Sequence, residues 1–280
     1  MSLVAVRCQR CGGAVAMEAG RTAPRCLFCG ADAPVPEALP DDAVPPELAV
    51  DFQTTAAAAQ EAFQAFATSR WLHPSDLRHA RIELSQLLFP AWLWQGRVEH
   101  HYAGLKRAAT RSGQRPETGT TVIAHDAFPV PASQTLSASE LQALAPFPCT
   151  ATRPFDAADL PVPFELGSLS SRAARALATR QMHQHDAARI ASTTNLSRLR
   201  SSCLFHDLAG RPILLPIWIG AYQYKDTAYR VVINGETGAL TGKGPIAWGK
   251  VAALVAAVLV VLAVLAVVFG SGGSPSRLRP

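Results

Sequence analysis

The sequence predicts an α+β protein in three parts: a small metal-binding module, an antiparallel β-rich body with helices, and one C-terminal transmembrane helix. Three observations predict it, namely two Cys-x-x-Cys pairs, two extended segments that share Pro-x-Trp, and an uninterrupted apolar run near the C-terminus. The chain has 280 residues, of which 49% are hydrophobic and 17% charged, which is too apolar for a disordered protein. Six cysteines in this length exclude a disulfide-rich secreted scaffold.

The formal net charge of +5 is unevenly distributed. Residues 241–280 carry four basic side chains and no acidic one, whereas residues 1–240 carry a net charge of only +1. The basic balance therefore belongs mainly to the C-terminal end of the chain and does not by itself indicate that the body binds nucleic acid.

The metal-binding module is predicted over residues 1–32 from the four cysteines Cys8, Cys11, Cys26 and Cys29. Each Cys-x-x-Cys pair is followed by a glycine, which allows a tight turn that directs two thiolates at one ion. Four thiolates complete a tetrahedral site with no open position, so we expect one structural Zn²⁺ in a zinc ribbon. Two disulfides, a redox Cys-x-x-Cys or an iron site are the alternatives.

Nucleic-acid binding by this ribbon is the weaker of two functional interpretations. Four arginines against Glu18 give residues 1–30 a charge of +3 before the metal is counted: Arg7, Arg10, Arg21 and Arg25. A zinc ion with four thiolates contributes −2, which leaves about +1. Phe28 alone offers an aromatic ring for base stacking. We expect a protein-contact or purely structural ribbon, with nucleic-acid binding as the alternative.

Residues 33–52 are predicted to form an acidic, proline-rich linker. Five prolines fall within 13 residues, together with four acidic residues: Pro34, Pro36, Pro40, Pro45, Pro46, Glu37, Asp41, Asp42 and Glu47. Such a segment is extended and semi-rigid, so we expect it to hold the ribbon away from the body.

The body, residues 53–240, is predicted to contain four helices. They cover residues 54–68, a short helix from Ser75 toward Leu87, residues 137–145 and residues 168–192. Ser137 and Glu140 form the capping-box pattern at the start of the third of these.

The strands of the body are predicted around two similar segments, which suggest an internal repeat. Residues 88–103 and 214–233 share an apolar-Pro-apolar-Trp order, in which Pro90 matches Pro216 and Trp92 matches Trp218. We expect each Trp on a buried face. A hairpin turn is expected at Lys225-Asp226, and further turns at residues 207–210 and 234–238.

The membrane anchor is predicted within residues 246–270. Val251 to Phe269 are 19 consecutive apolar residues, about 28 Å as a helix, which matches a hydrocarbon core of about 30 Å. Residues 271–280 are expected to be a flexible tail. Because zinc-binding thiolates need a reducing compartment, we expect a single-pass protein of the inner membrane with residues 1–240 in the cytoplasm.

The order of these features resembles a bacterial family of membrane-anchored zinc-ribbon proteins of unknown activity, whose members carry labels such as TFIIB-type zinc ribbon protein or primosomal-protein-N′-like. The matching stretches are the two Cys pairs and residues 89–93, 125–133, 215–219 and 229–240. The resemblance implies a membrane-associated scaffold without catalytic residues, in some relatives encoded beside flotillin-like or phage-shock-type proteins. Trp94 and His100-His101 depart from the charged residues usual there, so partner choice is not carried over.

The sequence contains no recognisable catalytic motif. Residues 238–244 have the wrong spacing for a phosphate-binding loop, and no Gly-x-Ser-x-Gly occurs. His183, His185 and Asp186, or His100 and His101, could bind a second metal, but a solvated surface is the favoured interpretation. We therefore expect an adaptor that holds protein partners at the membrane, with no enzyme activity and no small-molecule substrate.

Overall fold

The structure is a computed structural model that describes residues 3–18, 25–32, 34–38, 43–69, 71–107, 113–156, 162–225 and 227–270. The expected tail 271–280, Arg21, Pro40, the acidic pair Asp41-Asp42 and Asp226 lie outside the described residues. The elements, in chain order, are β1 (Leu3–Arg7), β2 (Ala14–Glu18), β3 (Val35–Glu37), β4 (Leu48–Val50), α1 (Ala56–Ser69), the 3₁₀-helix η1 (Ser75–His79), β5 (Glu83–Arg107), β6 (Gln114–Pro131), α2 (Ala138–Leu144), β7 (Thr152–Pro154), α3 (Ser171–Thr194), β8 (Ser197–Tyr224), β9 (Thr227–Asn234), β10 (Leu240–Gly242) and α4 (Trp248–Gly270).

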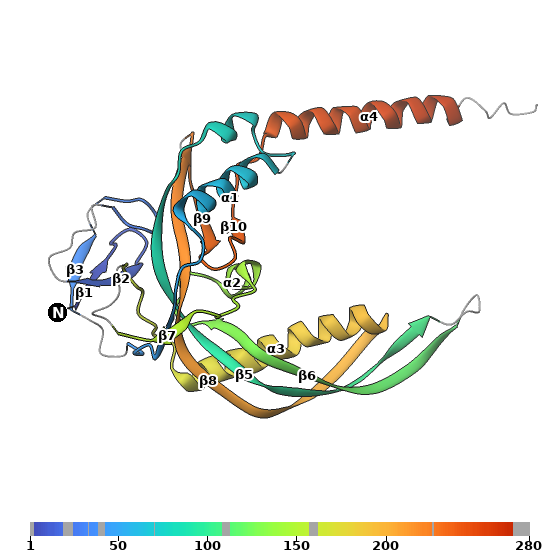
Figure 1. The fold of residues 1–280 in the computed structure, drawn as a ribbon. Coiled ribbons are helices and arrows are strands. Elements are labelled where there is room, and N and C mark those ends of the chain that lie inside the picture. The colour runs from blue at the N-terminus through green and yellow to red at the C-terminus, as the bar shows by residue number, and fades with distance from the viewer. Residues whose placement is uncertain are drawn as a thin grey trace, which may run out of the picture.

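The expected α+β architecture is confirmed, and its spine is one long antiparallel strand pair. β5 pairs with β8 from Glu83 opposite Ala221 to Leu105 opposite Ser197. β6 adds to β5, and β9 and β10 add to the other side of β8, all antiparallel. β4 runs parallel to β8 and carries β7 on its far side. Beyond β9 the sheet continues as a long curved arm of β5, β6 and β8, which α3 accompanies (Figure 1).

The two faces of this strand pair contact different parts of the molecule. Since side chains alternate between faces, residues of one parity share a face. The odd-numbered face packs in one core with the N-terminal module and α2; its members include Leu87, Phe89, Ala91, Leu93, Ile213, Leu215, Ile217 and Ile219. The even-numbered face packs against α3 through Trp92 and Trp94, and against α1 through Trp218 and Tyr222.

Trp92 is buried as expected, with 6% of its surface exposed, and it ties the sheet to the start of α3. Its indole Nε1 donates a hydrogen bond to the carbonyl of Leu169, two residues before α3 begins. The backbone amides of Ser168 and Leu169 donate to the carbonyl of Ala132, whose own amide donates to the carbonyl of Pro90. Pro90 therefore lies where its hairpin partner β6 ends, a position that tolerates the missing proline N–H.

Trp218, also 6% exposed, makes the corresponding set of bonds at the start of α1. Its Nε1 donates to the carbonyl of Thr54, two residues before α1 begins. The amides of Gln53 and Thr54 donate to the carbonyl of Gly235, whose amide donates to the carbonyl of Pro216. Each Pro-x-Trp segment is thus joined to a hairpin end and to a helix start by the same pattern of hydrogen bonds.

Two expected element boundaries are wrong. The turn expected at residues 207–210 is a β-bulge, because β8 runs unbroken from Ser197 to Tyr224 beside the continuous β5. Asp207 takes a left-handed φ of 54°, and β8 there has one residue more than β5 between matched pairs. The helix expected from Ser75 toward Leu87 ends at His79, since β5 already begins at Glu83 and pairs with β8.

The N-terminal module packs directly against the body, contrary to the expectation that the linker holds it away. Ala16 and Phe164 exchange two backbone hydrogen bonds, and Val6 and Phe28 belong to the same core as Phe89. Residues 33–52 contribute β3 to the small sheet of β1 and β2, and β4 to the large sheet. The extended conformation that proline favours is therefore used in strands, of which β4 is largely buried and β3 is largely exposed.

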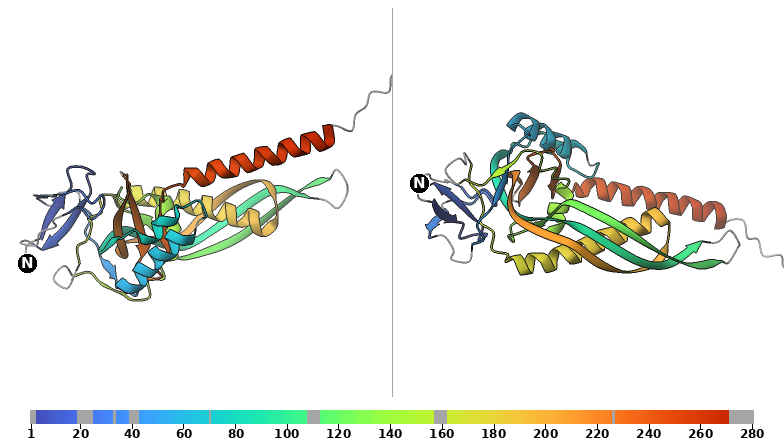
Figure 2. Two further views of the ribbon diagram at one scale, coloured as in Figure 1. Left: turned by 90° about the horizontal axis from the view of Figure 1, so that it is seen from above. Right: turned by 60° about the horizontal axis from the view of Figure 1, so that its bottom comes forward.

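The C-terminal helix α4 is long and apolar enough to cross a membrane. Its candidate span, Trp248–Ala266, has no buried portion. In both views of Figure 2 the N-terminal module lies at one end of the molecule, and α4 extends from the body toward the other end.

Asn234 connects the turn after β9 to the end of α2. It is fully buried; its side-chain Nδ2 donates to the carbonyls of Leu144 and Pro146, while its Oδ1 accepts from the amides of Glu236 and Thr237. A buried polar group left without its partner costs about 1–3 kcal/mol.

Replacing Asn234 by alanine is therefore expected to lower the free energy of unfolding by about 3 kcal/mol, because two buried carbonyls lose their donors. Chemical denaturation of the full chain in detergent, followed by tryptophan fluorescence, measures this. Gln223→Ala, at an exposed site on β8, is the control and should change stability by less than about 0.5 kcal/mol. Equal effects of both substitutions would contradict the assigned role.

Candidate metal centre and adjoining cleft

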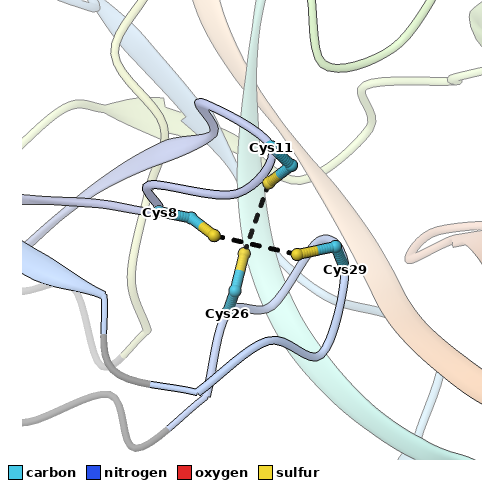
Figure 3. A group of neighbouring side chains, drawn as sticks. All are labelled: Cys8, Cys11, Cys26 and Cys29. Carbon is cyan, nitrogen blue, oxygen red and sulfur yellow. Dashed lines mark hydrogen bonds between the residues drawn. The ribbon is translucent and has the colours of Figure 1, made fainter.

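The four cysteines Cys8, Cys11, Cys26 and Cys29 converge from two similar turns. The first turn follows β1, and its Gly12 amide donates to the carbonyl of Cys8; in the second, the Gly30 amide donates to the carbonyl of Cys26. Gly12 and Gly30 have φ of 74° and 70°, a conformation that favours glycine at these two places. Figure 3 shows the four sulfur atoms pointing toward one another.

The distances between the sulfur atoms fit a tetrahedral metal site. Sγ of Cys8 lies 3.7 Å from Sγ of Cys29, and Sγ of Cys11 lies 3.6 Å from Sγ of Cys26. Zn–S bonds of about 2.3 Å in a tetrahedron separate the sulfurs by roughly 3.8 Å. All four thiols are free rather than disulfide-bonded. The group can therefore hold a metal ion.

The environment of these thiols favours a bound cation. Burial raises the pKa of Cys11 and of Cys26, against hydrogen bonds from backbone amides that lower it. At Cys8 burial also acts to raise the pKa, but the amides of Cys11 and Arg10 outweigh it and lower the pKa to about 7. A metal ion supplies the positive charge that lets four neighbouring thiolates exist together.

Two of the four arginines of the N-terminal module, Arg7 and Arg25, form ion pairs within it. Nε of Arg7 lies 2.8 Å from a carboxylate oxygen of Glu37, and Nε of Arg25 lies 3.2 Å from Asp32. Among the residues that the structure describes, no ion pair involves Arg10, which is exposed. Fewer arginines are therefore free to contact the phosphates of a nucleic acid, which needs several such contacts.

A cleft of about 810 Å³ lies between the metal module and the body. Arg7, Arg10, Cys11 and Phe28 line it from the module. The body contributes the segments 133–135, 165–168 and 228–230. The sequence did not indicate this cleft, because its walls come from segments far apart in the chain that meet only when the module docks.

Glu165 is a buried carboxyl in the wall of this cleft. Oε1 accepts a hydrogen bond from the hydroxyl of Thr135, while Oε2 is buried without a partner among the described residues. Burial raises the pKa of Glu165 to about 7, against the lowering effect of Thr135, Ser133 and Arg230. Two arginines of the cleft are already paired, Arg7 with Glu37 and Arg230 with Glu140, whereas the exposed Arg10 has no ion-pair partner among the described residues.

Only some of the residues considered as a second metal site lie on a solvated surface. His100 and Asp186 are completely buried between the arm and α3, and His183 lies beside His100. His101 and His185 are exposed. The two histidines of each candidate pair, His100 with His101 and His183 with His185, therefore lie in different environments. The solvated-surface interpretation is wrong for His100 and Asp186, because cross-strand and helix packing bring them together.

Comparison with known proteins gives a short likeness to one curated protein. No family model matches the chain, and no solved structure matches it. The chain is similar to "Uncharacterized protein YdjG" of Bacillus subtilis (strain 168), with 46% identity over 41 residues, which are 15% of this chain and 12% of that protein. The chain therefore spans well under two thirds of that relative's length.

Replacing Cys8 by serine should remove one metal ion per chain, because three thiolates no longer close the tetrahedron. Elemental mass spectrometry on the full chain purified in detergent measures the metal content. Cys149→Ser, which removes a cysteine outside the group, should leave the content unchanged. If Cys8→Ser and the wild type hold equal metal, the four cysteines do not form the site.

Replacing Glu165 by glutamine should make the stability less dependent on pH. The folded pKa of Glu165 lies above its ordinary value of 4.5, so the stabilising contribution of the protonated carboxyl is present below pH 4.5 and is lost as the pH rises through about 7. Above pH 7 the variant is expected to be more stable than the wild type by roughly 3 kcal/mol at most. Denaturation midpoints of both proteins between pH 5 and about 8 measure the difference; parallel curves would contradict the buried, raised pKa.

Proposed function

We propose that this protein is a non-catalytic adaptor that is anchored in the inner membrane and holds protein partners at its cytoplasmic side. In this proposal one zinc ion fills the four-cysteine group and has a structural role, since four protein ligands leave no position for a substrate. The reducing cytoplasm keeps the thiols free for the metal. The resemblance to membrane-anchored zinc-ribbon proteins also supports partners among membrane-stress or flotillin-like assemblies.

The observation that carries the proposal is the docked module and the cleft that it forms with the body. Arg10 is exposed on the cleft wall and has no ion-pair partner among the described residues. Arg230 lies in the opposite wall, where Glu140 already engages it at 2.7 Å. A protein segment that carries an acidic side chain fits this charge pattern better than a nucleic acid, which needs several free cations.

The base of α4 supports the membrane anchor. Nζ of Lys250 donates hydrogen bonds to the carbonyls of Trp71 and His73, and the amide of Ala247 donates to Leu72. Trp71 and Trp248 are 59% and 73% exposed at this point. Tryptophans with a nearby lysine are typical of the membrane–water interface. The body is thus attached to the anchor by defined contacts rather than by a free tether.

We also infer that the body consists of two copies of a unit made of an extended segment, a helix and a hairpin: β4 with α1, β5 and β6, and the segment at Phe164 with α3, β8 and β9. The matching hydrogen bonds of Trp92 and Trp218 support this, as do the parallel bridges of Ala49 to Leu214 and of Phe164 to Leu88. Within the two helix segments, and separately within the two Pro-x-Trp strands, each pair of equivalent residues is separated by the same number of positions. A chance match of Pro-x-Trp would not require this.

Site-specific photo-crosslinking tests the adaptor proposal. A photoreactive residue at Gln134, exposed in the cleft, should capture discrete protein partners in native membranes, whereas one at Glu61 on the outer face of α1 should not. Arg10→Glu should reduce capture at Gln134 at least severalfold. The adaptor proposal fails if Gln134 captures no protein, or captures the same proteins as Glu61; capture of RNA or DNA instead would favour the tethered nucleic-acid-binding alternative.

A further inference from the structure

A second cluster of ionisable side chains lies between α3 and the arm, far in sequence from the four cysteines. The buried stripe of α3 runs through Ala174, Ala178, Met182, Asp186 and Ile190, each four residues after the last. Asp186 thus occupies a core position of an amphipathic helix and has no exposed side-chain surface. A carboxylate in such a place is costly unless specific partners compensate it.

Two histidines from the sheet compensate Asp186. Nε2 of His100 on β5 and Nε2 of His125 on β6 each lie 2.9 Å from Oδ2 of Asp186. A carboxylate oxygen accepts hydrogen bonds, so this geometry assigns a proton to Nε2 of each ring.

This tautomer leaves the lone pair of His100 on Nδ1. That atom is completely buried and has no hydrogen-bond partner in the described part of the chain. Buried polar atoms of this kind are rare in native structures and call for a ligand or a bound ion. Cys203 is the residue directly opposite His100 in the β5–β8 register, so the two side chains share a face of the sheet.

His183 on α3 lies beside His100 and Cys203 and completes a group of three possible ligands. Its ring centroid lies 5.9 Å from that of His100, and Ser201 orients it through a 2.9 Å hydrogen bond between Oγ and Nε2. One ligand atom from each of His100, His183 and Cys203 lies within 4.8 Å of the other two. Two imidazoles and a thiol therefore converge from β5, β8 and α3.

We propose that His100, His183 and Cys203 form a second metal site, which binds a borderline-soft divalent ion of the zinc class. Such ions prefer imidazole and thiolate donors, whereas Mg²⁺ and Ca²⁺ prefer oxygen donors. Asp186 holds His100 through its other nitrogen, the carboxylate–histidine–metal arrangement that orients a ligand and raises its basicity. On binding, the Cys203 thiol releases its proton to solvent and forms the metal–sulfur bond.

The proposed ion would clamp α3 onto the arm. Figure 1 shows α3 lying along the strands that supply the other two ligands. The cluster adjoins the apolar core between the arm and α3, which contains Val98 and Met182 and against which Cys203 packs. Through the ion, His183 on α3 would be joined to His100 on β5 and Cys203 on β8. This would hold the later part of α3 to the sheet, as the hydrogen bond of Trp92 holds its start.

Metal content of the full chain in detergent tests the site. After saturation with ZnCl₂ and removal of loosely held ions, we expect two zinc ions per wild-type chain and one in Cys203→Ser or His183→Gln. Cys149→Ser is the matched control and should keep both, and Cys8→Ser should lose only the ribbon ion. Equal zinc in the wild type and in Cys203→Ser would overturn the proposal and would leave the four-cysteine site untouched.

A second measurement needs no variant and so does not depend on variant folding. The alkylation rates of Cys203 and Cys149 in the wild-type chain are followed by peptide mass spectrometry, with and without saturating ZnCl₂. Zinc should slow the labelling of Cys203 at least tenfold and leave that of Cys149 unchanged. Unchanged labelling of Cys203, or equal slowing of both cysteines, would overturn the site.

Discussion

The antiparallel pairing of β5 with β8 is the constraint on which the rest of the structure depends. Its register places Phe89 opposite Leu215 and His100 opposite Cys203. Because side chains alternate strictly along a strand, this register decides which residues meet the docked N-terminal module and which meet α1 and α3. A slip of one residue would move both tryptophans away from their helices and separate His100 from α3.

The two faces of this strand pair hold the two clusters that can bind metal, and they do so in different ways. The four cysteines belong to a small module whose own turns bring the thiols together and which packs on the body through Val6 and Phe28. The His/Cys group instead depends entirely on the sheet and α3, since its members come from three elements. The ribbon can organise its ligands locally, whereas the second group exists only in the folded body.

Two buried carboxyl groups illustrate how the body handles charge. Asp186 remains ionised because two histidines donate hydrogen bonds to it, whereas Glu165 has one hydroxyl donor at Oε1 and an unpartnered Oε2, and its pKa rises. On the face of the sheet that contacts α3, the negative charge of Asp186 therefore orients His100. On the cleft side Arg10 is the exposed arginine without an ion-pair partner among the described residues, and it supports the proposal of an acidic protein partner.

The sequence by itself determined the features that depend on local spacing. Cys8, Cys11, Cys26 and Cys29 were found because each pair is closed by its own tight turn, and α4 because membrane-spanning length is a property of one segment. Ser137 with Glu140 marked the start of α2 for the same reason. Tertiary structure alone decided that residues 207–210 form a bulge, since only the continuous β5 shows that β8 does not turn. It also decided the docking of the N-terminal module and the burial of His100 with Asp186. These depend on contacts between segments about 80 to 150 residues apart, whose burial outweighs the local preferences of proline, glycine and charged side chains.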